Sequence, residues 1–353
     1  MGCNPIIYIR VDANKEIATG HVMRTLAIAK QIKRLGGICK FIVADEYAKP
    51  IILNNGFEVI CLNSNWSNLD EEIIQMQQFI EKEQIKIILV DSYFVTKKYL
   101  EHLKEKVFVA YIDDLNLFKY PVHLLINYSA YYEMFKYETL NYNQETKFLL
   151  GCDYIPLREE FKDLVREKKD YLTNILITTG GTDAYHITYR LAKCLCRKEV
   201  LNNRVNLHIV VGRFNQDLNK IKKLAEEYSG IKVYQDISYM SQLMMECDIA
   251  VSAGGTTLFE LCACGLPTIC FAIADNQLMG IKALADKKLM YTVGDIRDDI
   301  ESGIQKIVHQ INDFIEHPTR CYEYSIRMQK LVDGKGAERI AECLLDKVKN
   351  DID

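Results

Sequence analysis

The sequence predicts an α/β protein built from two Rossmann-like, doubly wound parallel sheets in tandem. Three observations lead to this fold class. Short β-branched runs alternate with helical patterns, the alternation loosens once near the middle and then resumes, and 353 residues is about the length of two domains. Hydrophobic residues make up 49% and charged residues 26%, which excludes a disordered chain, a collagen-like fibre and a pure coiled coil.

The first half has the rhythm of βαβ units, in which buried parallel strands alternate with amphipathic helices. Helices are expected over His21–Leu35, over a short segment after Val43 and over Leu69–Glu83. A stretch dense in tyrosine, Tyr128–Tyr142, then interrupts the rhythm. The expected strands are Ile6–Val11, Ile38–Val43, Phe57–Leu62, Lys86–Asp91 and Val107–Asp113.

The second half repeats the rhythm, and a helix with one apolar stripe, Ala337–Lys349, closes the chain. We therefore predict an N-terminal Rossmann-like domain over residues 1–155, a C-terminal Rossmann-like domain over 156–335 and a closing helix over 336–353. The strands expected in this half are Asn174–Thr178, Val205–Val211, Ile231–Tyr234, Ile249–Val251 and Thr268–Ala272.

Composition narrows the partners and the compartment. Lys and Arg number 44 against 48 Asp and Glu, so the chain lacks the positive surplus of nucleic-acid binders, and we expect a small-molecule partner. The start of the chain lacks the features of a signal peptide, and no apolar run reaches the length of a membrane span. We expect reduced cysteines and a cytoplasmic protein without a membrane span, with a peripheral membrane contact and the oligomeric state left open.

Doubly wound sheets bind ligands at the carboxyl ends of their strands, where loops lead into helices, so three such loops are the candidates for function. The first holds Arg10, Asp12 and then Gly20-His21-Val22-Met23-Arg24. Gly20 allows close backbone approach, and a helix N-terminus disfavours imidazolium, which makes His21 a candidate general base. Local packing of His21, with Arg24 as a solvated charge, is the alternative.

The second loop is Thr179-Gly180-Gly181-Thr182-Asp183, before a helix that starts at about His186. Glycines and hydroxyls at a helix start can bind phosphate oxygens through backbone N–H groups. Neither the lysine of a Walker A loop nor a G-x-G-x-x-G pattern is present, so ATPase and dinucleotide-binding functions lack their motifs. A plain turn with Asp183 as helix N-cap is the alternative.

The third loop is Ser252-Ala253-Gly254-Gly255-Thr256-Thr257, followed by an apolar helix whose one acid is Glu260. A carboxylate can accept both hydroxyls of a ribose, although Thr257-x-x-Glu260 also fits a capping box. The next strand leads into Ala274-Asp275-Asn276-Gln277, whose amides suit sugar hydroxyl and acetamido groups. A simple helix cap with polar neighbours is the alternative there.

Together these motifs resemble those of nucleotide-sugar enzymes with the GT-B fold, and most closely the UDP-sugar hydrolases of pseudaminic acid biosynthesis. The likeness spans nearly the whole chain. The motifs that carry it are Arg10-x-Asp12, Gly20-His21-Val22-Met23-Arg24, Val90-Asp91-Ser92-Tyr93, Ile112-Asp113-Asp114-Leu115, Leu157-Arg158-x-Glu160-Phe161, Gly180-Gly181-Thr182-Asp183, Gly254-Gly255-Thr256-Thr257 with Glu260, and Ala274-Asp275-Asn276-Gln277. Ala18 and Ala184 depart from the family, which often has glycine and proline at these positions.

The resemblance implies two sheets facing across a cleft and a substrate, UDP-2,4-diacetamido-2,4,6-trideoxy-beta-L-altropyranose, whose anomeric C–O bond is hydrolysed with inversion. In the family's chemistry His21 would position or activate water, Asn276 would lie near the sugar, and Glu260 would bind the ribose. No metal or cofactor is implied. The other implied substrate contacts are Arg10, Asp12, Gly20, Arg24, Tyr93, Arg158, Gly180, Gly181, Thr182, Asp183, Gly254, Gly255, Thr256, Thr257 and Gln277.

Two other functions fit the same loops. A GT-B glycosyltransferase would use a UDP-amino sugar as donor and would need an acceptor surface, for which Lys97-Lys98 and Tyr128–Tyr142 are candidates. A UDP-sugar-binding regulator would bind without turnover. The one Asp-x-Asp motif, Asp351-Ile-Asp353, is the terminal tripeptide, where fraying argues against a metal site. The roles of Asp113 and Asp114 are left open.

Overall fold

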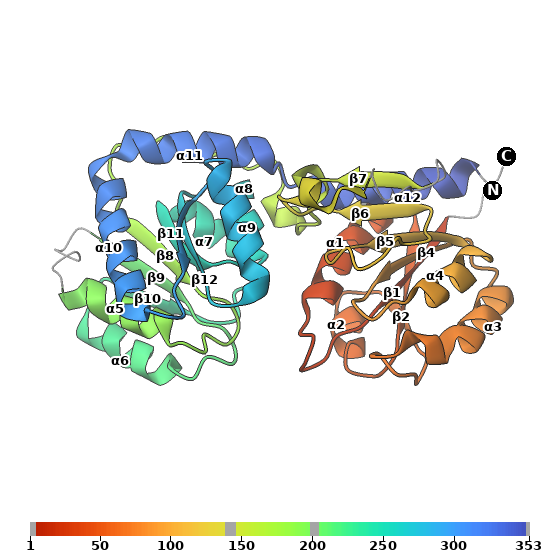
Figure 1. The fold of residues 1–353 in the computed structure, drawn as a ribbon. Helices are drawn as coiled ribbons and strands as arrows, with labels where there is room; N and C mark the ends of the chain where they lie inside the picture. The colour runs from red at the N-terminus through yellow and green to blue at the C-terminus, as the bar shows by residue number, and fades with distance from the viewer. Residues whose placement is uncertain (1–4, 138–145, 198–204, 351–353) are drawn as a thin grey trace. The chain divides into compact units, whose positions relative to one another are not determined.

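The computed structural model describes residues 5–137, 146–197 and 205–350, with side chains in the last range described to residue 347. The chain divides into two compact units (Figure 1): residues 1–159 with 335–353, and residues 160–334. We call these unit 1 and unit 2. The terminal Asp351-Ile-Asp353 and residues 138–142 of the tyrosine-dense stretch lie outside the described residues.

Unit 1 contains a seven-stranded parallel sheet in the order β3-β2-β1-β4-β5-β6-β7. Its strands are β1 (Ile6–Val11), β2 (Ile38–Val43), β3 (Glu58–Cys61), β4 (Ile87–Asp91), β5 (Phe108–Ile112), β6 (Leu124–Asn127) and β7 (Lys147–Leu150). Its α-helices are α1 (Gly20–Arg34), α2 (Lys49–Asn54), α3 (Ile73–Glu83), α4 (Lys97–Lys104) and α12 (Gly336–Asn350). Short 3-10 helices are η1 (Leu69–Glu72), η2 (Tyr132–Phe135), η4 (Cys152–Tyr154) and η5 (Glu159–Phe161), the last at the unit boundary.

Unit 2 contains a six-stranded parallel sheet in the order β10-β9-β8-β11-β12-β13. Its strands are β8 (Asn174–Thr178), β9 (Asn206–Val210), β10 (Ile231–Tyr234), β11 (Ile249–Ala253), β12 (Thr268–Ala272) and β13 (Tyr291–Asp295). Its helices are α5 (Ile187–Arg197), α6 (Leu218–Glu227), α7 (Met240–Glu246), α8 (Thr257–Ala263), α9 (Asp275–Asp286), α10 (Ile300–Glu316) and α11 (Pro318–Leu331).

The central strands are buried on both faces, as parallel sheets require. In β4 and β12 every residue is buried, and β-branched and aromatic side chains fill the cores between the sheets and their helices. Helix α12 returns from unit 2 to pack against α1, with Ile340, Ala341 and Leu344 fully buried. The apolar stripe predicted for this helix is thus its core face, although the side chain of Val348 lies outside the described residues.

The predicted fold class of two doubly wound parallel sheets is confirmed, and each predicted strand lies within two residues of an observed one. The sequence pattern missed three strands: β6 and β7, which flank the tyrosine-dense stretch, and β13. The first two border a stretch where the alternation with helical patterns is interrupted. In β13 the pairing with β12 skips Val293, and Gly294 has φ +83°. The predicted helix Leu69–Glu83 begins with the 3-10 turn η1.

In each sheet the chain first adds strands toward one edge and then, from one point on, adds them toward the other edge. We call this point the reversal point. In unit 1 it lies between β1 and β4, and in unit 2 between β8 and β11. Ligands of doubly wound folds bind at the carboxyl ends of the strands at this point. Three of the loops singled out in the sequence follow β1, β8 and β11, so the fold brings them to these two positions.

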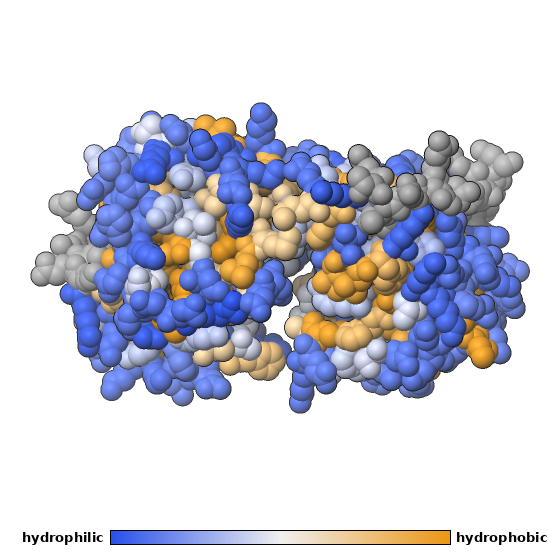
Figure 2. All heavy atoms as spheres, in the orientation of Figure 1, coloured by the Kyte–Doolittle hydropathy of each residue, from blue (hydrophilic) through white to orange (hydrophobic). Residues whose placement is uncertain are grey.

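Two surface properties bear on partners. No helix among the described residues is long and apolar enough to cross a membrane. Figure 2 shows mostly hydrophilic side chains on this face of each unit, with separate apolar patches between them.

Candidate active site

His21 is the second residue of α1 and lies at the reversal point of the unit 1 sheet. Its Nδ1 is 2.6 Å from Oδ1 of Asp91, the last residue of β4. The His21 side chain is 6% exposed and that of Asp91 is fully buried. The ring of Tyr93 packs edge-on against the imidazole, with centroids 4.4 Å apart. The histidine is therefore fixed on two sides by groups from β4 and the loop that follows it.

The hydrogen bond with Asp91 selects the tautomer of His21. Burial acts to raise the pKa of Asp91, but the positive charge of Arg24 and the His21 contact outweigh it and hold the pKa at about 2. An ionised carboxylate only accepts, so Nδ1 must carry the proton. In the neutral ring Nε2 then has a free lone pair, and it makes no hydrogen bond to any described residue. This arrangement can accept a proton from water.

Arg24, one turn along α1, holds the carboxylates in place. Its Nε and Nη2 donate to the two oxygens of Asp91 at 2.6 and 2.5 Å, and Nη1 donates to Asp114 at 2.7 Å. The same nitrogen also donates to the hydroxyl of Tyr128. Tyr93 donates to Asp114 at 3.2 Å, and burial together with that carboxylate raises the pKa of the Tyr93 phenol. Arg24 Nη2 also lies 3.0 Å from His21 Nδ1, so Arg24 contacts the histidine directly as well as orienting Asp91.

Sequence reasoning missed the partners of His21. The motif Val90-Asp91-Ser92-Tyr93 implies only Tyr93 as a contact, and Asp114 has no assigned role. Tyr128 belongs to the candidate acceptor surface, but it is buried and pairs with Arg24 instead. The available signal was topological, because an acid at the end of the strand after the reversal point lies beside the loop that follows β1.

Gly20 is exposed, with open space where a side chain would stand, as expected for a loop that a ligand approaches.

Arg10 and Asp12 do not join this network. Arg10 lies in β1 with no exposed surface, and it donates to Glu72 at 2.8 and 3.0 Å and to Asp12 at 2.5 Å. The second oxygen of Asp12 accepts from the amide of Ala44 at 2.7 Å. Both side chains belong to a buried ion-pair cluster, so we do not retain them as substrate contacts.

The two neighbouring aspartates after β5 have different surroundings. Asp113 is fully buried and accepts from the amides of Leu115 and Asn116 and from the hydroxyls of Tyr120 and Tyr137. It organises the loop that carries Asp114. Asp114 itself is 20% exposed and faces Arg24 and Tyr93.

In unit 2, the loop after β8 leaves Gly180, Gly181 and Thr182 exposed, and Gly180 has φ +86°. Asp183 is buried instead. Its two oxygens accept from the amides of Ile187 and Thr188, each at 2.9 Å. The Asp183 carboxylate thus binds the first amides of α5, although Asp183 lies four positions before the helix and is not its N-cap residue. The exposed glycine peptides are the part of this loop that is open to a ligand.

The loop after β11 contains Gly254, Gly255, Thr256 and Thr257. A Cβ on Gly254 would lie 2.7 Å from Ile281 Cγ2, so glycine is required for this loop to pack on α9. Thr256 is the N-cap of α8 but makes no side-chain capping bond, and Glu260 is partly exposed in the first turn. A capping box with Glu260 needs Thr257 at the N-cap position. Because α8 starts at Thr257 and its N-cap is Thr256, the pattern does not fit the capping box.

The segment after β12 forms the start of α9. Asp275 is exposed and pairs with Arg297 at 2.6 Å, and Asn276 is exposed with no protein partner among the described residues. The side-chain oxygen of Gln277 accepts from the amide of Ile273 at 2.9 Å, which turns its NH2 group to other partners. Arg158 is partly buried on the segment before η5.

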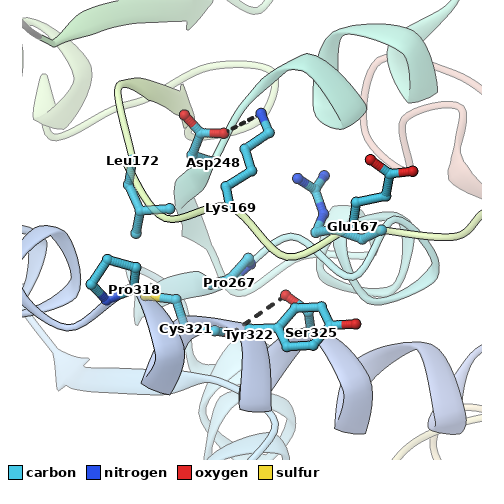
Figure 3. Close-up of a pocket in the computed structure, with 10 residues that line it drawn as sticks. Glu167, Lys169, Leu172, Asp248, Pro267, Pro318, Cys321, Tyr322 and Ser325 are labelled. Atoms are coloured by element: carbon cyan, nitrogen blue, oxygen red, sulfur yellow. Dashed lines mark hydrogen bonds and ion pairs between the residues drawn. The ribbon is translucent and has the colours of Figure 1, made fainter.

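A cavity of about 20 Å³ lies in unit 2, away from these loops. It is lined by Leu172, Asp248 and Pro267, which precede β8, β11 and β12, and by residues of α11 (Figure 3). Lys169 reaches across it to Asp248 at 2.5 Å. It lies at the amino ends of the strands and has room for about one water. No described group of three or more His, Cys, Asp or Glu side chains could hold a metal ion.

The two doubly wound sheets give the protein the GT-B fold. The MurG structure from Acinetobacter baumannii superposes with a TM-score of 0.69, at 14% identity, over 97% of this chain and 99% of that one. Residues 174–340 match the model for the glycosyltransferase family 28 C-terminal domain.

Four curated relatives are similar in sequence. The UDP-2,4-diacetamido-2,4,6-trideoxy-beta-L-altropyranose hydrolase of Campylobacter jejuni is 23% identical over 75% of this chain and 91% of its own. A spore coat polysaccharide biosynthesis protein of Bacillus subtilis is 22% identical over 98% of this chain and 99% of its own. A C. jejuni N-acetylglucosamine transferase, named for transfer to N-acetylmuramyl-(pentapeptide) pyrophosphoryl-undecaprenol, is 34% identical over 54% and 53%.

An uncharacterised protein of Methanocaldococcus jannaschii is 26% identical over 77% of this chain, which spans only 56% of that relative.

Proposed function

We propose that this chain is a UDP-sugar hydrolase that cleaves the anomeric C–O bond of UDP-2,4-diacetamido-2,4,6-trideoxy-beta-L-altropyranose, releasing UDP and the free sugar with inversion. The observation that carries the proposal is the buried Asp91–His21 pair, which leaves an unbonded Nε2 at the reversal point of the unit 1 sheet. The hydrolase relative supports the choice of substrate.

In the proposed reaction, His21 Nε2 takes a proton from water as the water oxygen bonds to the anomeric carbon. The bond between that carbon and the diphosphate oxygen breaks, and its electron pair leaves with UDP. Asp91 stabilises the imidazolium that forms, as the acid of a catalytic triad does. A positioned base of this kind contributes about 10² to 10⁴ in rate. Tyr93 lies beside the imidazole and is 40% exposed, so we propose it as a sugar contact.

Unit 2 would bind the nucleotide. The exposed peptides of Gly180–Gly181 and Gly255–Thr256 are the proposed diphosphate contacts, together with the Thr182 and Thr257 hydroxyls. The amides at the start of α5 are not part of this proposal, because Asp183 occupies them. Glu260 would accept from the ribose hydroxyls, and Asn276 and the Gln277 NH2 group would contact the sugar. Arg158 stays a predicted contact.

Incubation of the purified protein with the UDP-sugar and no acceptor tests this function. We expect UDP and free sugar to be released in equal amounts. Proton NMR monitors this release and also reports the anomeric configuration of the first product. A panel of UDP-linked diacetamido sugars would identify the substrate. Tight UDP binding with no turnover of any of them would favour a non-catalytic binding protein.

A glycosyltransferase is the second candidate, favoured by the match of residues 174–340 to a transferase domain model. It would share the UDP-binding loops but use a UDP-amino sugar as donor and a second sugar as acceptor. UDP release that occurs only after an acceptor is added would support this alternative over hydrolysis.

A further inference from the structure

A second histidine–aspartate pair lies in unit 2. His186, in the loop before α5, has Nδ1 2.5 Å from Oδ2 of Asp217, which precedes α6. The Asp217 side chain is 1% exposed, and its other oxygen accepts from Lys220 at 2.7 Å. The His186 side chain is 49% exposed, and its Nε2 has no hydrogen-bond partner among the described residues. The ring is therefore anchored at one nitrogen and open at the other.

The backbone around His186 is fixed by cross-links between the loops after β8 and β9. The His186 amide donates to the Asp183 carbonyl at 3.0 Å. Asn215 donates to the Asp183 carboxylate at 3.4 Å and accepts from the Asp217 amide at 2.8 Å. His186 itself has φ +58°, a left-handed conformation that is costly for a non-glycine residue and persists only where its surroundings enforce it.

The same two loops hold the exposed glycine peptides. A Cβ on Gly212 would lie 2.3 Å from the carbonyl oxygen of Gly180 and 2.4 Å from that of Gly181, so the loops touch through bare backbone. The amide of Phe214 donates to Gly181 at 3.1 Å. No atom lies within 4 Å of where a Cβ on Gly180 or Gly181 would stand. An open imidazole edge and open peptide edges thus belong to one rigid pair of loops.

The acids around His186 are each bound by a donor. Burial acts to raise the pKa of Asp217, but its hydrogen bonds to Lys220 and His186 lower it, so this buried acid is ionised and neutralised by its partners. The Asp183 carboxylate is buried against helix amides. Lys220 also packs on the ring of Tyr189. Arg213, 72% exposed, lies on the same loop as Gly212, 3.4 Å from the exposed Asp236.

We propose that His186 is a phosphate-binding residue: with Nδ1–H held by Asp217, the protonated ring donates its Nε2–H to a phosphoryl oxygen of the nucleoside diphosphate on the Gly180–Gly181 peptides, a proton that the neutral Nδ1–H form lacks. This inference rests on the proposed function, because it assumes that unit 2 binds UDP. The added contact is to the phosphates rather than to the nucleoside. A hydrogen bond between imidazolium and phosphate is charge-assisted and among the stronger kinds.

The test is isothermal titration of the full chain with UDP and, separately, with uridine, at pH 6 and pH 8. His186→Ala is expected to weaken UDP binding about 10-fold or more at pH 6 and to leave uridine binding unchanged. His186→Gln retains an N–H donor but does not titrate, so its UDP affinity should change less between the two pH values than that of the unaltered chain. The titration of UDP itself is common to all variants and cancels in this comparison.

The matched control is His317→Ala. His317 also pairs with an acid, Asp313 at 3.3 Å, and is 58% exposed, but it lies at the far end of α10. Equal UDP affinity for His186→Ala and His317→Ala would overturn the inference while leaving the proposed function intact. Equal losses for UDP and uridine would also overturn it, since they would mean that the loop, not the phosphate contact, had been disturbed. Failure of the unaltered chain to bind UDP would remove the proposed function and this inference together.

Discussion

The two sheets present different chemistry at equivalent places. At the reversal point of the unit 1 sheet, a histidine, an arginine and two aspartates form a largely buried network, in which His21 is 6% exposed. At the reversal point of the unit 2 sheet, the loops expose glycine peptides and threonine hydroxyls, and the histidine there is 49% exposed. The loops at the two reversal points therefore differ: those of unit 1 hold a fixed histidine side chain, and those of unit 2 expose peptide groups.

Under the proposed function, unit 1 supplies the base and unit 2 binds the diphosphate. A base must be held in one tautomer and orientation, which buried charge pairs do well because each member constrains the next. A diphosphate needs several donors at once, which bare peptide edges supply without bulky side chains. Variants that act on only one of the two regions should therefore separate turnover from UDP binding.

Removal of the imidazole should have the largest effect. We expect His21→Ala to lower turnover by about 10² to 10⁴, the range of a general base, with UDP affinity unchanged. Steady-state kinetics and titration with UDP measure the two quantities. His102→Ala, on the exposed side of α4, is the matched control. Near-normal turnover of His21→Ala would remove this residue from the mechanism.

Asp91→Asn should come next, with a loss of turnover of about 10- to 10³-fold, because the amide no longer selects the Nδ1–H tautomer. Asp114→Asn, which alters the contact to Arg24 but does not touch His21, should lose less. The same turnover for both variants would contradict an orienting role for Asp91.

The Asp91 carboxylate also predicts a pH dependence of stability. Its pKa is about 2 in the folded chain, against about 3.9 when unfolded, so its contribution to the free energy of unfolding is present above about pH 4 and is lost as the pH falls toward 2. The thermal unfolding temperature of the unaltered chain should therefore fall over this pH interval more than that of Asp91→Asn. Parallel curves for the two proteins would rule out the depressed pKa.

In unit 2, Glu260→Gln should weaken UDP binding by about 10-fold, the value of a charge-assisted hydrogen bond to the ribose. The comparison ligand is 2′-deoxy-UDP, which lacks one of the two hydroxyls and should lose less with the same substitution. Equal losses for the two nucleotides would argue against contact with the ribose diol.

Two adjacent glycines should affect stability rather than turnover, and one of them should have no effect on it. Gly254→Ala places a methyl group 2.7 Å from Ile281 and 2.9 Å from Gln277, so α9 must shift, at a cost of about 1–3 kcal/mol in stability. Gly255→Ala meets no atom within 4 Å and should unfold like the unaltered chain. Chemical denaturation of both variants checks this, and a reversed order would contradict the packing described for this loop.

The sequence predicted the parts of the molecule whose signal is local. Buried strands such as Ile6–Val11 and Thr268–Ala272 were predicted to the residue, because continuous apolar runs bounded by turns leave little choice. Strands β6 and β7 border the tyrosine-dense stretch, where the alternation with helical patterns is interrupted, and they were missed although the equally short β3 and β10 were predicted.

Contacts between segments distant in sequence could not be predicted in the same way. Asp91 and His21 are 70 positions apart, and only the strand order brings them together. The family resemblance implied Arg10 as a ligand contact, and its partner Glu72, 62 positions away, gave no sign in the sequence of a buried pair. Asp183 was ambiguous in sequence for another reason, since a cap and a ligand contact use the same residue type in the same place.

The central claim, that water attacks the anomeric carbon, is tested most directly by turnover of the UDP-sugar in ¹⁸O-water, with the UDP product measured by mass spectrometry. Cleavage of the C–O bond leaves the bridging oxygen on UDP, so we predict that the released UDP carries no ¹⁸O. UDP that contains one ¹⁸O would show attack at phosphorus and would contradict the account.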